Sequence, residues 1–289
     1  MNLNGIIPPI VTPFKENGDI HMEFLKREMK ICLDAGSNGI SVAGSTGEGP
    51  TLTDEELQTL VRAGKSVLGS DQPLVCGIMR TCTRAAVTAG LAAKEAGADA
   101  IMVTPTAYNV LVPNEEGMFD FYKTISEEVR LPIIIYNVIP QNTISAGLYT
   151  KLLNETDYVI GIKQSTGGIQ ALYQDIMYSR NQGKVYAATD DMIFSCFELG
   201  ASGAISAILS LFPKECCKMW QCAVEDRHKE GLQIQNSLYM KWKNLGGTQF
   251  PIRLKYALEL TGREVGFCRS PITYLSESDK EAIRTSLFQ

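Results

Sequence analysis

Residues 158–163 read Tyr-Val-Ile-Gly-Ile-Lys and continue into the polar string Gln-Ser-Thr-Gly-Gly at 164–168. A short apolar run bounded by glycine is typical of a buried strand, so we expect a strand that ends at Lys163. Lysine is rarely buried, and an amine that loses its hydration has a lowered pKa and a free lone pair. The position indicates either a nucleophile that forms a Schiff base or a lysine whose head simply reaches solvent.

Similar apolar runs recur through the first three quarters of the chain. The expected strands lie near residues 5–11, 39–44, 74–78, 99–104, 132–137, 158–163, 184–188 and 203–208. They are continuous rather than alternating, as in a parallel sheet covered on both faces, and amphipathic segments separate them. Eight strand–helix units predict an α/β fold, the (β/α)8 TIM barrel. A doubly wound open sheet is the alternative, which the lack of a glycine-rich loop after the first strand disfavours.

After about residue 225 the pattern becomes purely helical. Three helices are expected at residues 228–244, 250–261 and 277–287. They are too few to build much core alone. We therefore expect a catalytic barrel over 1–225 and a C-terminal three-helix extension over 226–289.

The composition excludes several classes of function. Apolar residues make up 45% and charged residues 20%, which is ordinary for a globular protein. A net charge of -5 without a dense basic run argues against nucleic acid, and no apolar stretch is long enough for a membrane. Without a signal-peptide pattern, the eight scattered cysteines indicate reduced thiols and a cytoplasmic protein. Only two histidines are present, so neither a histidine metal site nor a Ser-His-Asp triad is expected.

In a barrel, the working residues sit at the carboxyl ends of the strands. The second expected strand ends in Gly-Ser-Thr-Gly-Glu-Gly at 44–49, where hydroxyls and backbone N–H groups can hold a small carboxylate. An ordinary solvent-exposed turn is the alternative. The fourth ends in residues 104–109 and the fifth at Tyr136. A tyrosine there is more often a packing residue, but strand order places Tyr136 next to Lys163.

The motifs at 44–48 (Gly-Ser-Thr-Gly-Glu), 136–137 (Tyr-Asn) and 161–163 (Gly-Ile-Lys) resemble, in order and spacing, the signature of the dihydrodipicolinate synthase/N-acetylneuraminate lyase superfamily. The resemblance runs from residues 5–14 to 269–271. It implies a TIM barrel with a helical tail, usually a homotetramer built as a dimer of dimers. It also implies a lyase without metal or cofactor that acts on pyruvate or another 2-oxo acid and an aldehyde or sugar acid.

The same resemblance implies roles for single residues. Lys163 would form the imine, and Tyr136 would relay protons to and from the substrate. Ser45 and Thr46 would bind the carboxylate, with Thr46 also linking the tyrosines. Tyr108 is similar to the tyrosine that family members extend across the tight dimer interface to complete the proton relay.

Two further strand ends complete the expected site. Ile205 resembles the residue whose backbone lies over the imine. The loop at 187–191 reads Ala-Ala-Thr-Asp-Asp. Thr189 there either presents its hydroxyl to a polyol chain or, with Asp190, merely caps the next helix.

The segment after Tyr136 departs from the synthase pattern. Synthases that use aspartate semialdehyde carry an arginine here that binds the aldehyde's carboxylate. This chain has Asn142 in that region, a candidate substrate-binding residue that cannot replace a bidentate guanidinium. Sialic acid lyases prefer a histidine where Asn137 stands, whereas Gln164 is more typical of lyases than of synthases.

The leading hypothesis is a class I lyase, a 2-keto-3-deoxy sugar acid aldolase or dehydratase. The alternative activities are 4-hydroxy-tetrahydrodipicolinate (dihydrodipicolinate) synthase and N-acetylneuraminate lyase. A non-enzymatic hypothesis is that the chain is a catalytically idle barrel, one without turnover, that serves as a 2-oxo acid binding or regulatory subunit. A phosphate-binding barrel enzyme is disfavoured because the last two strand ends lack a glycine-rich cradle.

Overall fold

The chain folds into a closed parallel barrel, seen here in a computed structural model that describes residues 2–288. The strand order is β1-β8-β7-β6-β5-β4-β3-β2. A parallel bridge between Pro9 and Ser41 joins the two outer strands of this order, where the Ile10 N–H donates to the Ser41 carbonyl at 2.8 Å. The predicted (β/α)8 barrel is therefore confirmed. The strands are β1 (Gly5–Ile6), β2 (Ile40–Val42), β3 (Leu74–Ile78), β4 (Ala100–Val103), β5 (Ile133–Asn137), β6 (Val159–Gln164), β7 (Lys184–Ala187) and β8 (Gly203–Ala204).

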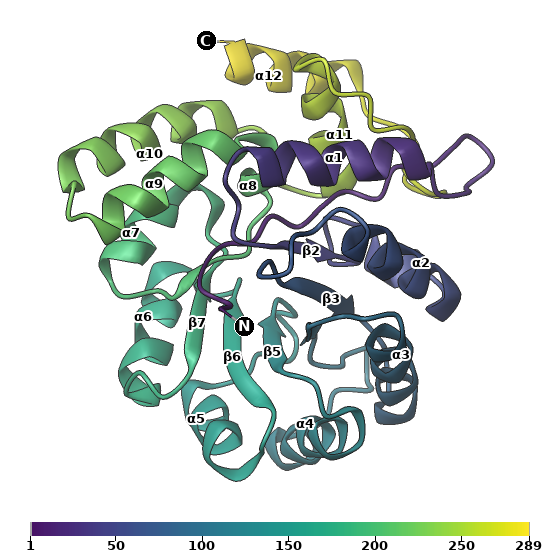
Figure 1. Cartoon of the computed structure of the whole chain (residues 1–289), viewed down its shortest axis with the longest axis vertical. Coiled ribbons are helices and arrows are strands. Elements are labelled where there is room, and N and C mark those ends of the chain that lie inside the picture. Colours follow the sequence, from purple (N-terminus) through teal and green to yellow (C-terminus); the bar gives the residue numbers. More distant parts are fainter. Residues whose placement is uncertain (1, 289) are drawn as a thin grey trace.

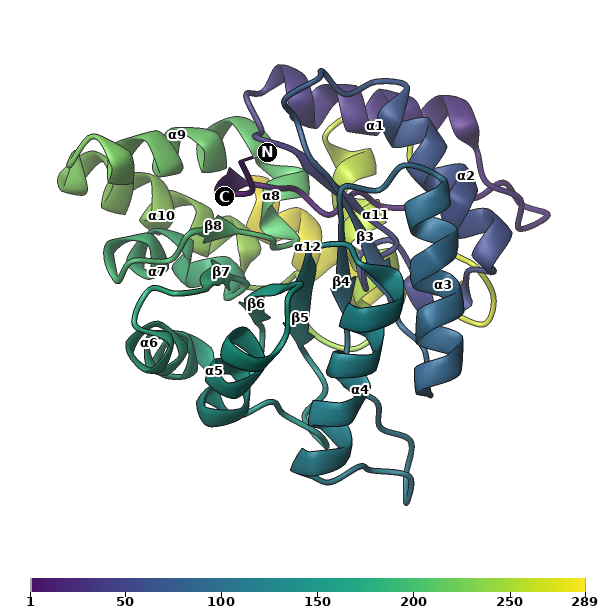
Figure 2. The ribbon, with the colours of Figure 1, turned by 60° about the horizontal axis from the view of Figure 1, so that its bottom comes forward.

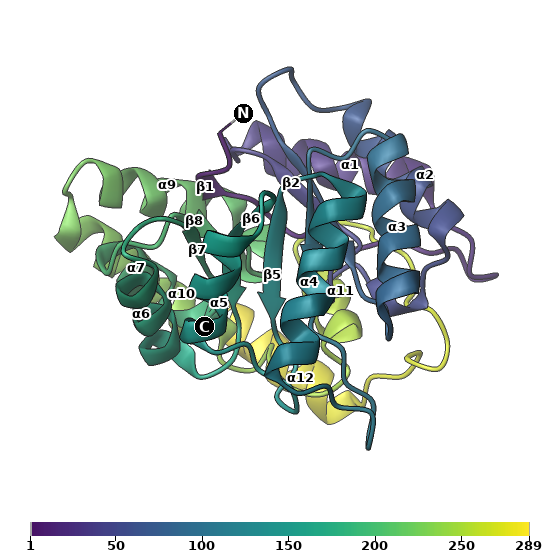
Figure 3. The same cartoon turned by 90° about the horizontal axis from the view of Figure 1, so that it is seen from below.

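Helices surround the barrel in chain order from α1 to α7 (Figure 1). Viewed from the side, α3, α4 and α5 cover the outer face of the strands (Figure 3). No helix within residues 2–288 combines the length and the apolar character needed to cross a membrane. The α-helices are α1 (Met22–Asp34), α2 (Asp54–Lys65), α3 (Thr83–Glu95), α4 (Glu115–Val129), α5 (Ala146–Glu155), α6 (Gly168–Ser179), α7 (Ile193–Glu198), α8 (Ile208–Leu211), α9 (Pro213–Val224), α10 (His228–Trp242), α11 (Phe250–Leu260) and α12 (Glu277–Phe288); η1 (Gly49–Thr51) and η2 (Asp190–Met192) are 3-10 turns.

The apolar residues form two separate layers. The larger one lies between the sheet and the helices, and the smaller one fills the inside of the barrel. The alternation of side chains along each strand explains the division, because neighbours on a strand point to opposite faces. The inner layer comprises Leu3, Ile7, Val75, Ala100, Met102, Ile134, Tyr136, Tyr186 and Ile205.

The two terminal strands are shorter than their apolar runs suggested. The run at 5–11 forms a regular strand only at its start and then pairs with β2 through the single bridge at Pro9, because the prolines at 8–9 have no N–H to donate. The run at 203–208 ends earlier because Ile208 already begins α8. Its N–H donates at 2.9 Å to the carboxylate of Asp190, which caps this short helix. A side chain distant in sequence thus ends the eighth strand.

The C-terminal helices pack beside the barrel, where α10 contacts α9, α11 contacts α8, and α12 contacts both α10 and α11 (Figure 2). They match the three helices expected after residue 225, and α10 continues directly from α9 through a turn at 225–227. We propose that the boundary between the barrel and the extension lies in this turn.

A buried ion pair attaches α11 to the barrel. Lys255 and Glu48 are 2% and 3% exposed, and the ammonium lies 2.7 Å from the carboxylate. The ammonium also donates to the carbonyls of Thr12, at 2.7 Å, and of Phe267. The second oxygen of Glu48 accepts the N–H of Arg269 at 2.8 Å. All three ammonium hydrogens therefore have acceptors, which is the condition under which a buried charge is tolerated.

Replacing Lys255 by methionine is expected to lower the free energy of unfolding by about 3–5 kcal/mol, because Glu48 would remain buried without its counter-ion. Urea unfolding measures this change. Lys280→Met, which removes an ion pair with the exposed Glu277, serves as the control and should leave the urea midpoint nearly unchanged, because solvent screens this pair. Adding Glu48→Gln to Lys255→Met should recover part of the loss. Equal urea midpoints for Lys255→Met and wild type would contradict the role of this pair.

Candidate active site

Lys163 lies between two tyrosines at the carboxyl end of the barrel. Strand register pairs it with Tyr136 on β5 and with Tyr186 on β7. The amine is 3.8 Å from the centroid of the Tyr136 ring, and both residues are 5% exposed. The side chain of Tyr186 is fully buried, and its hydroxyl donates to the Leu3 carbonyl at 2.8 Å. The neighbouring positions of Lys163 and Tyr136 follow from strand order, as expected.

The two buried lysines differ in what their ammonium groups contact. Lys255 uses all three hydrogens on protein oxygens, one of them a carboxylate. Lys163 makes no hydrogen bond and no ion pair within residues 2–288, although it is almost as buried. Burying an amine without protein acceptors costs free energy, and such groups are concentrated at functional sites. Lys163 is thus open to a ligand in the barrel mouth.

The loop at 44–49 faces these residues. The Tyr136 hydroxyl donates to the Ser45 hydroxyl at 3.1 Å. Thr46 is buried, and its hydroxyl makes no hydrogen bond within the described chain. The contact that joins this loop to Tyr136 is therefore made by Ser45, whereas the resemblance assigned the link to Thr46. The backbone N–H groups of Ser45 and Thr46 also have no partner within residues 2–288, so they are available to an anion.

The shape of this loop depends on two features of its end. Gly49 packs so closely on Ala43 that an added Cβ would lie 2.1 Å from the Ala43 carbonyl oxygen, so only glycine fits. Glu48 adopts a left-handed conformation, with φ of 56°, while its carboxylate is held by Lys255. The C-terminal extension therefore helps to set the conformation of the loop that carries Ser45 and Thr46.

Two amide side chains connect the ends of β5 and β6. The Asn137 side chain donates to Gln164 Oε1 at 2.9 Å and to the Ile144 carbonyl at 2.9 Å, and it accepts the Ile144 N–H at 2.9 Å. Asn137 and Gln164 directly follow Tyr136 and Lys163 in sequence. This amide pair fixes the two strand ends on which the tyrosine and the lysine sit. In the sequence these amides indicated only a resemblance to the family, because their pairing depends on strand register.

The remaining strand-end residues have different surroundings. Ile205 is fully buried inside the barrel, and its N–H donates to the Ala187 carbonyl at 3.1 Å. Thr189 directly precedes η2 and makes no side-chain capping hydrogen bond, while Asp190 caps α8 rather than the next helix. Burial raises the pKa of Asp190, against the hydrogen bonds that it accepts and the nearby charge of Lys163.

Asn142 and Tyr108 lie in the loops that follow β5 and β4. The Asn142 side chain donates to the Thr106 carbonyl at 2.7 Å and so links the loops after β5 and β4. Tyr108 is 69% exposed and forms a small antiparallel bridge with Leu111. Within one chain, the structure does not bring Tyr108 to Lys163.

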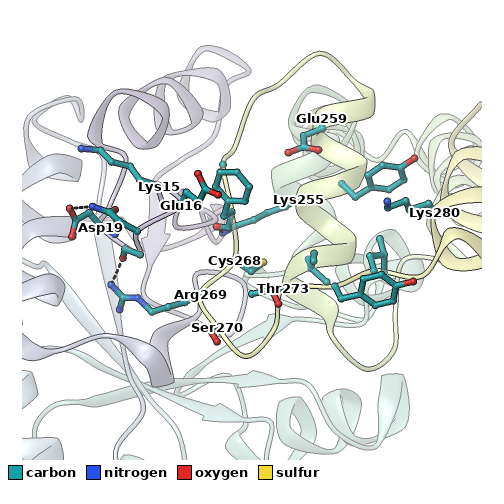
Figure 4. A pocket seen from close by; sticks show the side chains of 18 residues that line it. Lys15, Glu16, Asp19, Lys255, Glu259, Cys268, Arg269, Ser270, Thr273 and Lys280 are labelled. Atoms are coloured by element: carbon teal, nitrogen blue, oxygen red, sulfur yellow. Dashed lines mark hydrogen bonds between the residues drawn. The ribbon is translucent and has the colours of Figure 1, made fainter.

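A separate cavity of about 880 Å³ lies between residues 15–19, α11 and residues 266–275. Figure 4 shows acidic and basic side chains of these segments around it, among them Lys255 and Arg269. No predicted site residue lines this cavity. Within residues 2–288, no three histidine, cysteine, aspartate or glutamate side chains are grouped closely enough to hold a metal ion.

Comparison with known proteins extends over the whole chain. The sequence profile described as the dihydrodipicolinate synthetase family matches residues 2–289. A relative from Dehalococcoides mccartyi, named 4-hydroxy-tetrahydrodipicolinate synthase, is 32% identical over 99% of this chain and 96% of its own length. A dihydrodipicolinate synthase structure from Aquifex aeolicus is 30% identical, with a TM-score of 0.91 over 99% of this chain and 97% of that one. One from Acinetobacter baumannii, in complex with pyruvate, is also 30% identical, with a TM-score of 0.92 over 99% and 98%.

Proposed function

The chain belongs to the dihydrodipicolinate synthetase family, lyases of the class I pyruvate-dependent aldolase superfamily, and we propose that Lys163 forms an imine with the ketone of a 2-oxo acid. The observation that carries this proposal is the buried amine of Lys163, which rests on the Tyr136 ring without a hydrogen-bond acceptor of its own. The pyruvate complex of the Acinetobacter baumannii relative supports pyruvate as the 2-oxo acid.

The chemistry follows from the groups around the amine. The nitrogen of Lys163 adds to the ketone carbon, and the resulting hydroxyl leaves as water once it is protonated. The Tyr136 hydroxyl is placed to donate that proton and to exchange it with Ser45 at 3.1 Å. The substrate hydroxyl then gives its proton to the Tyr136 oxygen, which lost one to the departing water. The carbon–carbon bond breaks, its electron pair passes to the protonated imine, and an aldehyde departs. The enamine left behind is protonated at carbon, and water releases the 2-oxo acid.

The loop at 44–49 fits the carboxylate of the 2-oxo acid. The hydroxyls and the two unpartnered N–H groups of Ser45 and Thr46 can receive its oxygens. The short contact between Ser45 and Tyr136 would then couple carboxylate binding to the proton relay. We assign Ile205 to the wall beside the imine, because it is the buried residue at the end of the eighth strand.

The second substrate is proposed to be an uncharged, hydroxylated aldehyde, which makes the activity that of a 2-keto-3-deoxy sugar acid aldolase or dehydratase. The loop after β5, residues 138–145, contains no basic side chain. A second carboxylate entering here would find no guanidinium or ammonium in this loop to bind it. Asn142 and Thr189, by contrast, can hydrogen-bond to hydroxyl groups.

A second candidate activity is 4-hydroxy-tetrahydrodipicolinate synthase. It is favoured by the name of the Dehalococcoides mccartyi relative, which is 32% identical over nearly the whole chain. The two candidates share the imine on Lys163 and differ in the aldehyde. They are therefore separated by substrate choice and not by the first chemical step.

The protein is proposed to act as a homotetramer in which the hairpin at 107–112 contacts a partner subunit. Tyr108, Val110 and Leu111 are 69%, 84% and 69% exposed on this hairpin. Three neighbouring exposed apolar side chains are typical of an interaction surface. In that arrangement, the hydroxyl of Tyr108 would complete the proton relay of the neighbouring site.

Incubation with pyruvate and borohydride should leave a reduced adduct on Lys163, detectable by peptide mass spectrometry. Lys163→Ala should carry no adduct and should lose at least about 10³-fold in kcat, because covalent catalysis is removed. Lys151→Ala, an exposed lysine on α5, is the matched control and should be labelled like wild type. A folded wild-type protein without an adduct would disprove the imine mechanism.

A panel of aldehydes, each supplied with pyruvate, should show higher kcat/KM for glyceraldehyde and longer hydroxylated aldehydes than for aspartate semialdehyde. The difference expected from the missing cationic partner is roughly 10- to 100-fold, because one charged hydrogen bond contributes about 1.5–3 kcal/mol. N-Acetylmannosamine belongs in the same panel. A preference for aspartate semialdehyde would select the synthase instead.

Sedimentation should find a tetramer, and Leu111→Asp should shift it to smaller species because a charge in an apolar contact is costly. Leu111→Met keeps the apolar surface and should remain tetrameric. A wild-type monomer at micromolar concentration, or a tetramer that tolerates Leu111→Asp, would exclude this hairpin as the contact.

A further inference from the structure

A second cavity lies directly behind the candidate active site. It has a volume of about 360 Å³ and sits between the first turn of α5 and the residues of α6 from Ala171 to Tyr178. Asn137 and Gln164, the amide pair that follows Tyr136 and Lys163, form part of its wall. The cavity is thus separate from the barrel mouth but adjacent to it.

The cavity contains a buried carboxylate without a protein partner. Asp175, on α6, is 3% exposed, and its Oδ2 makes no hydrogen bond within the described residues. No lysine, arginine or histidine is among the residues that line the cavity. Burial raises the pKa of this carboxyl to about 7. An ionised Asp175 that is buried without a counter-ion costs free energy, and a cation bound beside it would reduce that cost.

The opposite wall carries partial positive charge. The cavity is lined by Ser145, Ala146 and Gly147, the cap and first turn of α5. The Ser145 hydroxyl accepts the backbone N–H of Leu148. The backbone N–H groups of Ala146 and Gly147 have no acceptor within residues 2–288. The second helix, α6, begins after Gly167, which provides no side-chain cap. The start of α5 therefore presents unpaired N–H groups to the cavity, which favour an anion.

We propose that this cavity binds a small zwitterion with a primary ammonium and a carboxylate, such as a short α-amino acid. The ammonium would pair with Asp175 and share its other hydrogens with oxygens such as those of Gln164 and Thr166 on the same wall. The carboxylate would meet the N–H groups of Ala146 and Gly147 at the start of α5. A volume of 360 Å³ is at the small end of ligand sites and suits such a molecule.

Binding should depend on pH through Asp175, because only its ionised form attracts an ammonium. Affinity should therefore weaken as the pH falls through about 7. Tyr149 from α5 is close enough to feel the charge of this carboxyl, and Tyr178 from α6 lines the same cavity. Glu115 from α4 accepts a hydrogen bond from the Ser145 hydroxyl at 3.2 Å. Asp175→Asn should abolish the pH dependence if Asp175 is its source.

The raised pKa of Asp175 also predicts how the stability of the ligand-free protein changes with pH. A carboxyl whose pKa is raised in the folded state favours folding while it is protonated, so this contribution falls as the pH rises from about 4 to about 7. Asp175→Asn should accordingly have a higher Tm than wild type at pH 8, and the difference should shrink towards pH 4. This readout shows that the variant is folded before any ligand is added.

The binding test measures Tm and calorimetric affinity for L-alanine at pH 8, with ethylammonium chloride and sodium acetate as single-group probes. L-Alanine should raise the Tm of wild type, ethylammonium should do so weakly, and acetate should have little effect. Asp175→Asn should bind L-alanine at least about 10-fold more weakly, which corresponds to about 1.4 kcal/mol. Repeating the titration with pyruvate present separates this cavity from the site at Lys163.

Two further variants keep the result interpretable. Ala171→Leu places a larger side chain in the cavity one helical turn before Asp175 and should also weaken binding without removing the charge. Asp157→Asn removes an equal but exposed charge and should bind like wild type. The proposal is overturned if L-alanine does not bind wild type, if Asp175→Asn binds it equally well, or if acetate alone gives the same shift. Borohydride trapping of pyruvate on Lys163 should be unchanged throughout, so failure here is distinct from failure of the proposed function.

Discussion

The buried ion pair between Lys255 and Glu48 joins the C-terminal helices to the N-terminal part of the barrel. It joins α11, late in the sequence, to the loop that follows the second strand, and every hydrogen of the ammonium is used. Glu48 is held in a left-handed conformation, and the compact loop before it carries Ser45 to within 3.1 Å of the Tyr136 hydroxyl. A charge pair that is distant in sequence thus supports the geometry on which the proposed chemistry depends. Removing one partner of a buried ion pair strongly destabilises the folded protein, although the intact pair is not always more stable than two apolar residues in its place.

Comparison of the two buried lysines shows how burial alone fails to identify a catalytic amine. Lys255 has three oxygen acceptors, whereas Lys163 has an aromatic ring and no acceptor within the described chain. The first is what a structural buried lysine requires, and the second leaves the nitrogen to a substrate. The same reasoning, applied to a carboxylate, distinguishes Asp190, which caps α8, from Asp175, whose Oδ2 has no partner.

Much of the fold could be predicted from local patterns. Continuous apolar runs located all eight strands. The predicted strand boundaries were wrong where residues distant in sequence determine the end of the strand. The eighth strand stops early because Asp190 caps the helix at Ile208, a contact that no pattern within residues 203–208 can indicate. For the site, strand order placed Tyr136 beside Lys163, but the choice of Ser45 over Thr46 as the contact of Tyr136 required the folded loop.

The sequence by itself determined the kind of fold and the residue types at the strand ends, because apolar periodicity and glycine placement act over a few residues. It also placed Lys163 at the end of a buried strand and left the loop after Tyr136 without a basic side chain. Only the tertiary structure decided which buried charges are paired, which N–H groups remain unpaired, and where cavities lie. The physical reason is that hydrogen bonds and ion pairs form between atoms that strand register and helix packing bring together, and neither is local in sequence.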